Sequence, residues 1–353
     1  MLSFPLDKPS VWERMAASAL PLALYGTGDG ADKILAVTDR LGLKVQRLFV
    51  SDDFFRGQTF RGLPASPLSA LEEDSRYLVL LAFGSHRPEI LQRVRRLARR
   101  HSLLIPDVPV CGDTLFDRDF ILRHREELAR AYELFEDEAS RRVFRLALEY
   151  KFTGEPETLF AMESCRDEVF SDLLPLGPRE HYLDLGAYRG DTVEEFLAAV
   201  GGCFASITAL EPDPRSFRKL QEAFGTAPGI TLLQQAIGRT SGIACLRQGR
   251  GRGSVLSGQK TDLSVACTSV DDLDRPVTYL KMDLEGTEAE TLESAARTLA
   301  VQAPMLNVAC YHRSEDLFRL PLLISSLQPR YRLFLRRHPC VPCWDLNLYA
   351  RPR

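Results

Sequence analysis

The sequence predicts an α/β protein with two open, mainly parallel sheets, and three observations support this class. Short apolar runs alternate with amphipathic segments along most of the 353 residues, which is typical of βαβ units. The runs Leu20 to Tyr25 and Tyr182 to Leu185 each end in a glycine-containing turn that precedes a helix-like segment. The last two apolar runs, Tyr331 to Arg337 and Leu346 to Ala350, are too close together for a crossover and must pair antiparallel.

The composition is that of an ordinary globular chain, with 26% charged and 45% hydrophobic residues. A chain of 353 residues is too long for one typical core and suggests more than one domain. The formal net charge of −3 argues against a general nucleic-acid binder, because phosphate neutralisation needs a basic excess. No apolar stretch reaches membrane-spanning length, and the scattered cysteines suit reduced thiols, so we expect a cytoplasmic protein.

The first predicted domain, residues 1–113, is a small Rossmann-like domain. Glycines follow its first strand, and Asp52 follows the strand from Val45 to Val50. Together with the run from Gly57 to Pro64, these residues resemble the nucleotide-sugar-binding domain at the front of certain bacterial sugar acyltransferases. The alternative is a domain that serves packing or dimerisation with an empty turn. The resemblance implies a nucleotide site at Gly26, Thr27, Gly28 and Asp52.

Residues 114–178 predict a helical connector, because apolar residues recur at helical spacing from Asp117 to Tyr150. We expect a further helix from Thr158 to Leu174. The second domain, residues 179–353, then continues with alternating strands and helices. Its basic loop, residues 248–254, predicts either an irregular tip or a lid over an anionic or sugar substrate.

The turn after Leu185 is bracketed by two acids, Asp184 and Asp191, and contains Gly186 and Gly190. We expect these glycines to permit close approach of a ligand or to relieve strain in the turn. A pyrophosphate would not tolerate carboxylates there, whereas a cation would. S-adenosylmethionine (SAM) carries an ammonium and a sulfonium.

Glu211 follows the next predicted strand, where a doubly wound sheet places the acid that chelates a ribose. The glycine turn and the following Glu-Pro resemble the SAM site of class I methyltransferases. The resemblance implies a cofactor site formed by Asp184, Gly186, Ala187, Tyr188, Gly190, Asp191, Thr192, Glu211, Pro212, Asp213, Gln235 and Ala236.

A second group of charges follows the strand that begins near Val277. Alternation along this strand places Lys281, Asp283 and Glu285 on one side of the pleat, at the rim of the ligand cleft. His312 follows a later strand and should reach the same rim. We expect His312, or else Asp283, to be the general base, with a structural histidine as the alternative. Asp283 and Glu285 could instead hold a divalent cation, although no third carboxylate is evident from the sequence.

Four motifs in order, at 183–192, 268–273, 280–288 and 311–317, resemble the FkbM family of SAM-dependent methyltransferases. The resemblance covers Tyr182 to the C-terminus. It implies a class I methyltransferase sheet with an antiparallel C-terminal hairpin. It also implies O-methylation of a hydroxyl on a polyketide, sugar or glycan, with a nucleotide sugar as one candidate acceptor. The alternatives are a non-catalytic nucleotide-sugar-binding or scaffold protein and an oxidoreductase, and homo-oligomerisation stays open.

Overall fold

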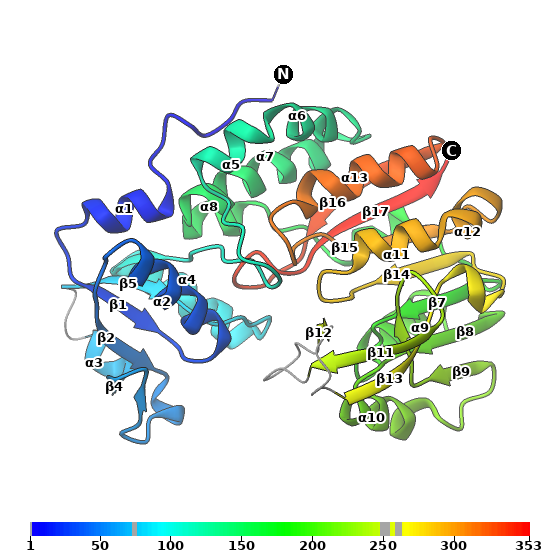
Figure 1. Ribbon diagram of the computed structural model, residues 1–353, viewed down its shortest axis with the longest axis horizontal. Coiled ribbons are helices and arrows are strands. Elements are labelled where there is room, and N and C mark those ends of the chain that lie inside the picture. Colours follow the sequence, from blue (N-terminus) through cyan, green and yellow to red (C-terminus); the bar gives the residue numbers. More distant parts are fainter. Residues whose placement is uncertain (1, 73–75, 248–254, 258–262) are drawn as a thin grey trace. The chain divides into compact units, whose positions relative to one another are not determined.

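The computed structural model describes residues 2–72, 76–247, 255–257 and 263–353 (Figure 1). The chain forms two compact units. Unit 1 contains residues 1–126, 141–164 and 337–345, and unit 2 contains residues 127–140, 165–336 and 346–353. Each unit contains an open sheet dominated by parallel strands with helices between them, which confirms the predicted Rossmann-like α/β class.

The sheet of unit 1 has the strand order β3-β4-β2-β1-β5-β6. Its strands β1, β2, β4, β5 and β6 are parallel, and β3 pairs antiparallel with β4. Strands β1 and β5 are buried along their whole length, which explains why they are continuous apolar runs. The bounds are β1 Leu22–Tyr25, β2 Val45–Val50, β3 Thr59–Phe60, β4 Leu63–Pro67, β5 Leu78–Leu81 and β6 Ser102–Leu104.

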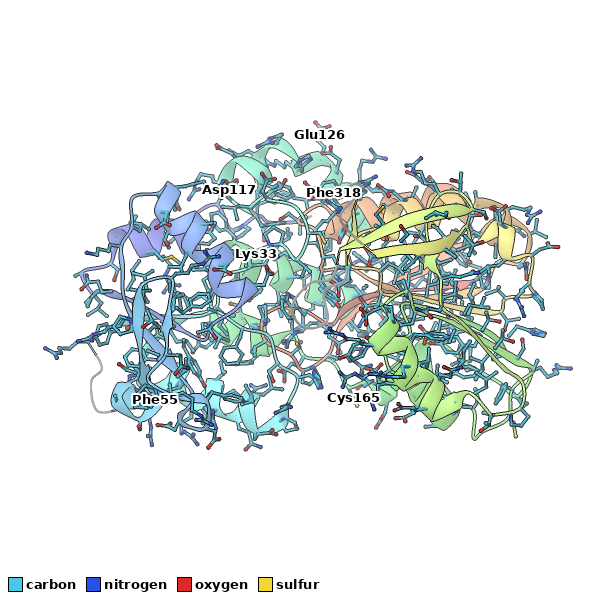
Figure 2. All side chains as sticks on the ribbon, turned by 60° about the horizontal axis from the view of Figure 1, so that its bottom comes forward. Lys33, Phe55, Asp117, Glu126, Cys165 and Phe318 are labelled. Carbon is cyan, nitrogen blue, oxygen red and sulfur yellow. The ribbon has the colours of Figure 1, made fainter. Side chains whose placement is uncertain are left out.

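The helices of unit 1 bury one apolar face each. In α4, Leu91, Val94 and Leu97 are buried at helical spacing. Lys33 of α2, which is labelled in Figure 2, donates from Nζ to the carbonyl oxygens of Pro109 (3.0 Å) and Val110 (2.6 Å). The bounds are α1 Val11–Ala17, α2 Asp29–Arg40, η1 Asp52–Phe54, α3 Leu68–Glu72, α4 Pro88–Arg100, α5 Arg118–Arg123 and α8 Pro156–Ala161.

The predicted connector is helical. Helices α6 (Arg125–Glu133) and α7 (Glu138–Thr153) each contribute residues to both units. The helix expected from Thr158 to Leu174 is wrong as a single element. It separates into α8 and the π-helical turn η2 (Val169–Leu173), and between them the Ser164 amide donates to the Arg337 carbonyl oxygen at 2.8 Å.

The main sheet of unit 2 has the strand order β16-β17-β15-β14-β7-β8-β9. Strands β7, β8, β9, β14 and β15 are parallel, and β17 pairs antiparallel with β15. This is the Rossmann-like class I arrangement, and the last strand lies between β15 and β16. The bounds are β7 His181–Leu185, β8 Ser206–Leu210, β9 Ile230–Leu233, β14 Tyr279–Met282, β15 Met305–Ala309, β16 Tyr331–Arg337 and β17 Leu346–Pro352.

A second, four-stranded sheet in unit 2 has the order β10-β13-β11-β12. The chain leaves the main sheet after β9, and Ala236 then pairs with Cys267 of β13. Ala236 and Val265 form the small core of this sheet. The bounds are β10 Ala236–Ile237, β11 Gly242–Arg247, β12 Val255–Ser257 and β13 Leu263–Thr268. The basic loop at 248–254 lies outside the described residues.

The helices of unit 2 bury apolar side chains against the main sheet. Where α9 packs on the sheet, the Tyr182 ring of β7 stacks on the ring of Phe196 from α9 and on that of Tyr279 from β14, with centroid distances of 4.5 and 4.8 Å. Helices α11 and α12 are separated at Ala295. No helix in the described part of the chain is long and apolar enough to span a membrane. The bounds are α9 Asp191–Ala199, α10 Pro214–Phe224, η3 Asp271–Leu273, α11 Glu288–Ser294, α12 Ala296–Val301 and α13 Asp316–Leu327.

Candidate functional site

A pocket in unit 2 lies where strands β7, β8 and β14 end. Most of the residues predicted to bind the cofactor line it, as do Lys281, Asp283 and Glu285, whereas His312, Asp184, Ala187 and Gly190 do not. The lining residues not predicted from the sequence are neighbours of predicted ones in sequence or on the first helical turn. The lining consists of Gly186, Tyr188, Asp191, Thr192, Leu210, Glu211, Pro212, Asp213, Ser216, Gln235, Ala236, Ile237, Lys281, Asp283, Leu284, Glu285 and Thr287.

The two glycines of the first turn are required by packing of the chain on itself. Both have left-handed φ angles, +81° at Gly186 and +98° at Gly190. A Cβ at Gly186 would lie 2.1 Å from the Asp283 carbonyl oxygen, and one at Gly190 would lie 2.4 Å from the Phe224 ring. The structure therefore adds a physical reason to the one expected from the sequence: a side chain would collide with protein atoms before it met a ligand.

Asp184 is fully buried and makes contacts within the protein. Its Oδ2 accepts a hydrogen bond from the Thr192 hydroxyl at 2.5 Å, and its Oδ1 lies 3.1 Å from Nζ of Lys281. Lys281 also donates to the carbonyl oxygen of Gly186 at 2.7 Å. Burial alone would lower the pKa of Lys281, but the Asp184 carboxylate raises it above its ordinary value. Asp184 thus fixes the turn through Lys281 and Thr192 and does not face the pocket.

Glu211 is the acid at the end of β8, and only 7% of it is exposed. Its carboxylate accepts the backbone N–H groups of Tyr188 (2.9 Å) and Asp213 (2.8 Å), which hold it at the wall of the pocket. Burial raises the pKa of Glu211 to about 7, although the two backbone donors oppose this shift. The side chain therefore titrates near neutral pH.

Asp283 and Glu285 follow β14 at the pocket wall. Their side chains are 40% and 24% exposed. Glu285 has a left-handed φ of +52°, as Gly286 does at +95°, so the chain turns sharply after β14. The Tyr311 hydroxyl donates to Oδ1 of Asp283 at 3.2 Å. Two carboxylates are thus accessible from the pocket at this strand end.

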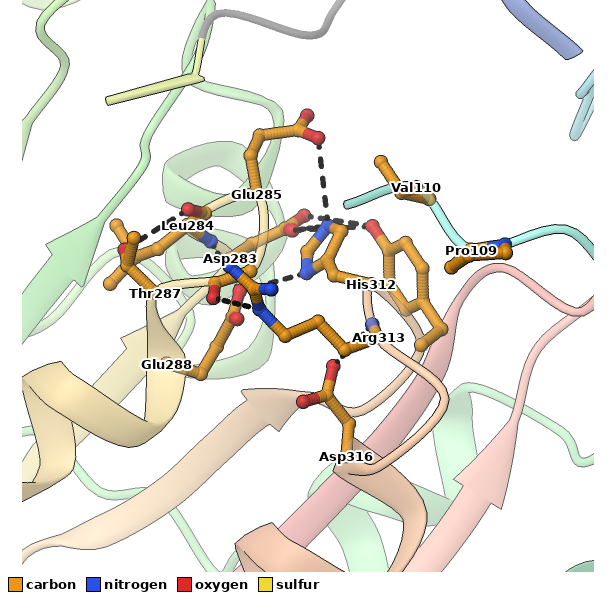
Figure 3. Close-up of polar contacts among 12 residues, drawn as sticks. Pro109, Val110, Asp283, Leu284, Glu285, Thr287, Glu288, His312, Arg313 and Asp316 are labelled. Atoms are coloured by element: carbon orange, nitrogen blue, oxygen red, sulfur yellow. Dashed lines mark hydrogen bonds and ion pairs between the residues drawn. The ribbon is translucent and has the colours of Figure 1, made fainter. Parts of the chain in front are cut away.

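His312 lies behind these carboxylates and is fully buried (Figure 3). Its Nδ1 lies 2.8 Å from Glu288, and its Nε2 lies 3.3 Å from Asp283 and 3.8 Å from Glu285. Burial would lower the pKa of His312, but the three carboxylates raise it to about 10. The ring is therefore an imidazolium at neutral pH when only protein groups surround it. Neither ring nitrogen makes a well-aligned hydrogen bond among the described residues.

The glycine turn of unit 1 connects β1 to α2. A Cβ at Gly26 would lie 2.4 Å from the Phe83 ring, whereas a Cβ at Gly28 would meet open space. Thr27 is exposed between them. Asp52 accepts a hydrogen bond from the Ser69 hydroxyl at 2.6 Å. The nucleotide site expected at these residues stays a prediction.

The chain is similar to known proteins in sequence and in structure. The Methyltransferase FkbM domain matches residues 184–337. Methyltransferase FkbM from Methylobacillus flagellatus KT has a similar structure, with a TM-score of 0.72 over 96% of this chain and 92% of that chain, at 22% sequence identity. This likeness shows the fold, and its coverage includes unit 1 as well as unit 2. Curated protein sequences include no match to this chain.

Weaker structural likenesses cover about half of the chain. The fibrillarin of Aeropyrum pernix, a structure with natively bound SAM, matches 50% of this chain and 68% of that chain at 12% identity and a TM-score of 0.33. An rRNA methylase from Streptococcus thermophilus matches 50% of this chain and 89% of that chain at 14% identity and a TM-score of 0.33. The domain match thus identifies residues 184–337, within the part of the chain that carries the pocket, as similar to the Methyltransferase FkbM domain, and the class I fold of the main sheet agrees with this match.

Proposed function

We propose that this chain is a methyltransferase that transfers the methyl group of SAM to a hydroxyl oxygen of a sugar, glycan or related small molecule. One observation carries the proposal: a single pocket contains Glu211 at the end of β8 and two carboxylates, Asp283 and Glu285, at the end of β14. Strand β7 lies between these strands, so the two ends of the pocket are about 10 Å apart at ordinary strand spacing. The pocket can therefore hold a cofactor beside an acceptor.

The residues present fit SAM. Glu211 would accept hydrogen bonds from the ribose hydroxyls, and its two backbone donors already fix its orientation. Asp191 lines the same wall and would face the ammonium group. SAM supplies an electrophilic methyl group when it is bound. Lys281 is engaged with Asp184 and Gly186, so it would support the turn instead of binding the cofactor.

Methyl transfer to a hydroxyl needs an aligned oxygen and removal of its proton. His312 is buried and already carries a proton at neutral pH, so we propose that it positions Asp283 and is not the base. Asp283 is accessible from the pocket and is held by Tyr311. We assign proton removal to the end of the pocket formed by Asp283 and Glu285.

Calorimetry with SAM and with NAD tests the cofactor assignment directly. We expect SAM to bind and NAD not to bind, because acids bracket the turn where a pyrophosphate would lie. The acceptor class is tested by incubating the enzyme with radiolabelled SAM, nucleotide sugars and cell-envelope extracts. Binding of NAD without binding of SAM would contradict the proposed function.

A further inference from the structure

One imidazole and three carboxylates converge beside the pocket. One donor atom each of Asp283, Glu288 and His312 lies within 4.8 Å of the other two. Nε2 of His312 is also 3.3 Å from Oδ1 of Asp283 and 3.8 Å from Oε2 of Glu285. Two ligands at right angles on a cation with bonds of about 2.1 Å are about 3 Å apart. Nε2 of His312 is therefore close to this spacing from Asp283, and the Glu285 side chain would have to move closer to share the same cation.

The buried histidine distinguishes this group from a cluster of acids on a surface. His312 is 0% exposed, yet its Nε2 makes no well-aligned hydrogen bond among the described residues and is aimed between Asp283 and Glu285. A buried ring nitrogen normally has a hydrogen-bond partner or a metal ion. The buried ring nitrogen is therefore directed at the place where the two accessible carboxylates converge.

Glu288 holds the opposite side of the ring. Its Oε1 lies 2.8 Å from Nδ1 of His312 and also accepts the backbone N–H of Leu284 at 2.7 Å. A carboxylate beside Nδ1 favours keeping a proton there, so a cation would displace the other proton, on Nε2, to water and bind the Nε2 lone pair. The contact with Leu284 fixes Glu288 against the loop that carries Asp283.

We propose that Asp283, Glu285 and Nε2 of His312 bind one divalent cation of the Mn²⁺ or Mg²⁺ class, with Glu288 holding the imidazole ring. Two carboxylate oxygens and one imidazole nitrogen form a ligand set that Mn²⁺ accepts, and water can reach the remaining positions from the pocket. Binding of the cation does not depend on the proposed function. Its catalytic role does: the cation would lower the pKa of an acceptor hydroxyl, and the released proton would pass to water in the pocket.

The test is Mn²⁺ binding to the full chain, measured by electron paramagnetic resonance in the absence of SAM. We expect one Mn²⁺ per chain, with nitrogen coupling from His312 in electron spin echo spectra. Glu285→Gln and Asp283→Asn should each weaken binding at least tenfold. Glu222→Gln is the matched control, because Glu222 lies on α10 in an exposed ion pair with Lys219. His312→Gln should abolish the nitrogen coupling, and because Glu285 is only partly buried, Glu285→Gln keeps the test valid if the His312 variant does not fold.

The absence of stoichiometric Mn²⁺, the absence of nitrogen coupling, or unchanged affinity in both carboxylate variants would overturn the cation site. SAM binding is measured on the same preparations in the presence of EDTA. Retained SAM binding without Mn²⁺ binding would refute the cation site alone. If the chain binds Mn²⁺ but neither binds SAM nor transfers a methyl group, this result would count against the proposed function and leave the cation site established.

Discussion

Nδ1 of His312 lies 2.8 Å from Oε1 of Glu288, and both side chains are 1% exposed. This contact joins the loop after β15 to the first turn of α11. Because Glu288 also accepts the Leu284 amide, it connects His312 to the chain segment that carries Asp283 and Glu285. The carboxylates at the pocket wall are therefore supported from behind by a buried charged pair.

Glu211→Ala should weaken SAM binding. A hydrogen bond to a charged group contributes about 1.5–3 kcal/mol, so the dissociation constant should rise by about 10- to 150-fold. Calorimetry on the purified variant measures this, with Glu222→Gln as a control that changes an exposed acid of the same unit. Parent-like affinity in Glu211→Ala would remove Glu211 from the cofactor site.

The affinity for SAM should rise with pH around neutrality. Because the pKa of Glu211 is about 7, only the ionised form above that pH accepts hydrogen bonds on both oxygens. If that form alone binds SAM, the dissociation constant should fall by about tenfold between pH 6 and pH 8. Glu211→Gln should bind weakly with a flat profile over the same range. A parent profile as flat as that of the variant would contradict this assignment.

The same shift has a consequence for stability. The folded pKa of Glu211 is raised above its ordinary value of 4.5, so its contribution is fully present below about pH 4.5 and is lost as pH rises through about 7. In the absence of SAM, Glu211→Gln should therefore gain stability relative to the parent across this window. Urea unfolding at pH 4.5, 6 and 8 measures the difference, which should increase with pH.

Asp283→Asn should lower kcat by about 10²- to 10⁴-fold, the usual contribution of assisted proton removal, because that step is assigned to this end of the pocket, while SAM affinity stays close to that of the parent. His312→Gln should lower kcat as well, because it removes the contact that positions Asp283. A loss confined to SAM binding would mean that Asp283 only shapes the pocket. Full activity in both variants would show that proton removal does not depend on the residues at the end of β14.

Asp184→Ala should destabilise unit 2. It leaves Lys281 buried without its partner, and breaking a buried pair typically costs about 3–5 kcal/mol. Lys281→Met should also be destabilising, and the double variant should cost less than the sum of the two, since neither charge is then left alone. Denaturant unfolding measures all three. Additive effects would show that Asp184 and Lys281 are not energetically coupled.

Thr27→Trp tests the expected nucleotide site of unit 1. Thr27 is exposed in the glycine turn, so a large side chain there should block the turn without entering the core. We expect UDP-glucose, as a representative nucleotide sugar, to bind the parent and not the variant, whereas SAM should bind both. The absence of UDP-glucose binding to the parent would favour the alternative of a packing or dimerisation domain.

The sequence by itself determined the α/β class, the strand ends and the residues of the first turn. These features depend on local chemistry: apolar runs of strand length, glycines at left-handed positions and acids directly after strands. Gly186, Glu211 and Asp283 could therefore be assigned to one pocket, since the carboxyl ends of parallel strands share an edge. The four motifs that resemble the FkbM family could be identified in the same way, because each is a short run of consecutive residues.

Only the tertiary structure decided which of these charges face the pocket. Asp184 and Lys281 are cross-strand partners on β7 and β14, so their side chains form an ion pair with each other. Glu288 was not predicted, because it reaches His312 from a helix and the periodicity of that helix marks only an inward-facing position. Such contacts depend on strand order and on helix placement across about a hundred residues of sequence. Local sequence patterns carry no information on either, so burial and pairing emerge only when the chain has folded.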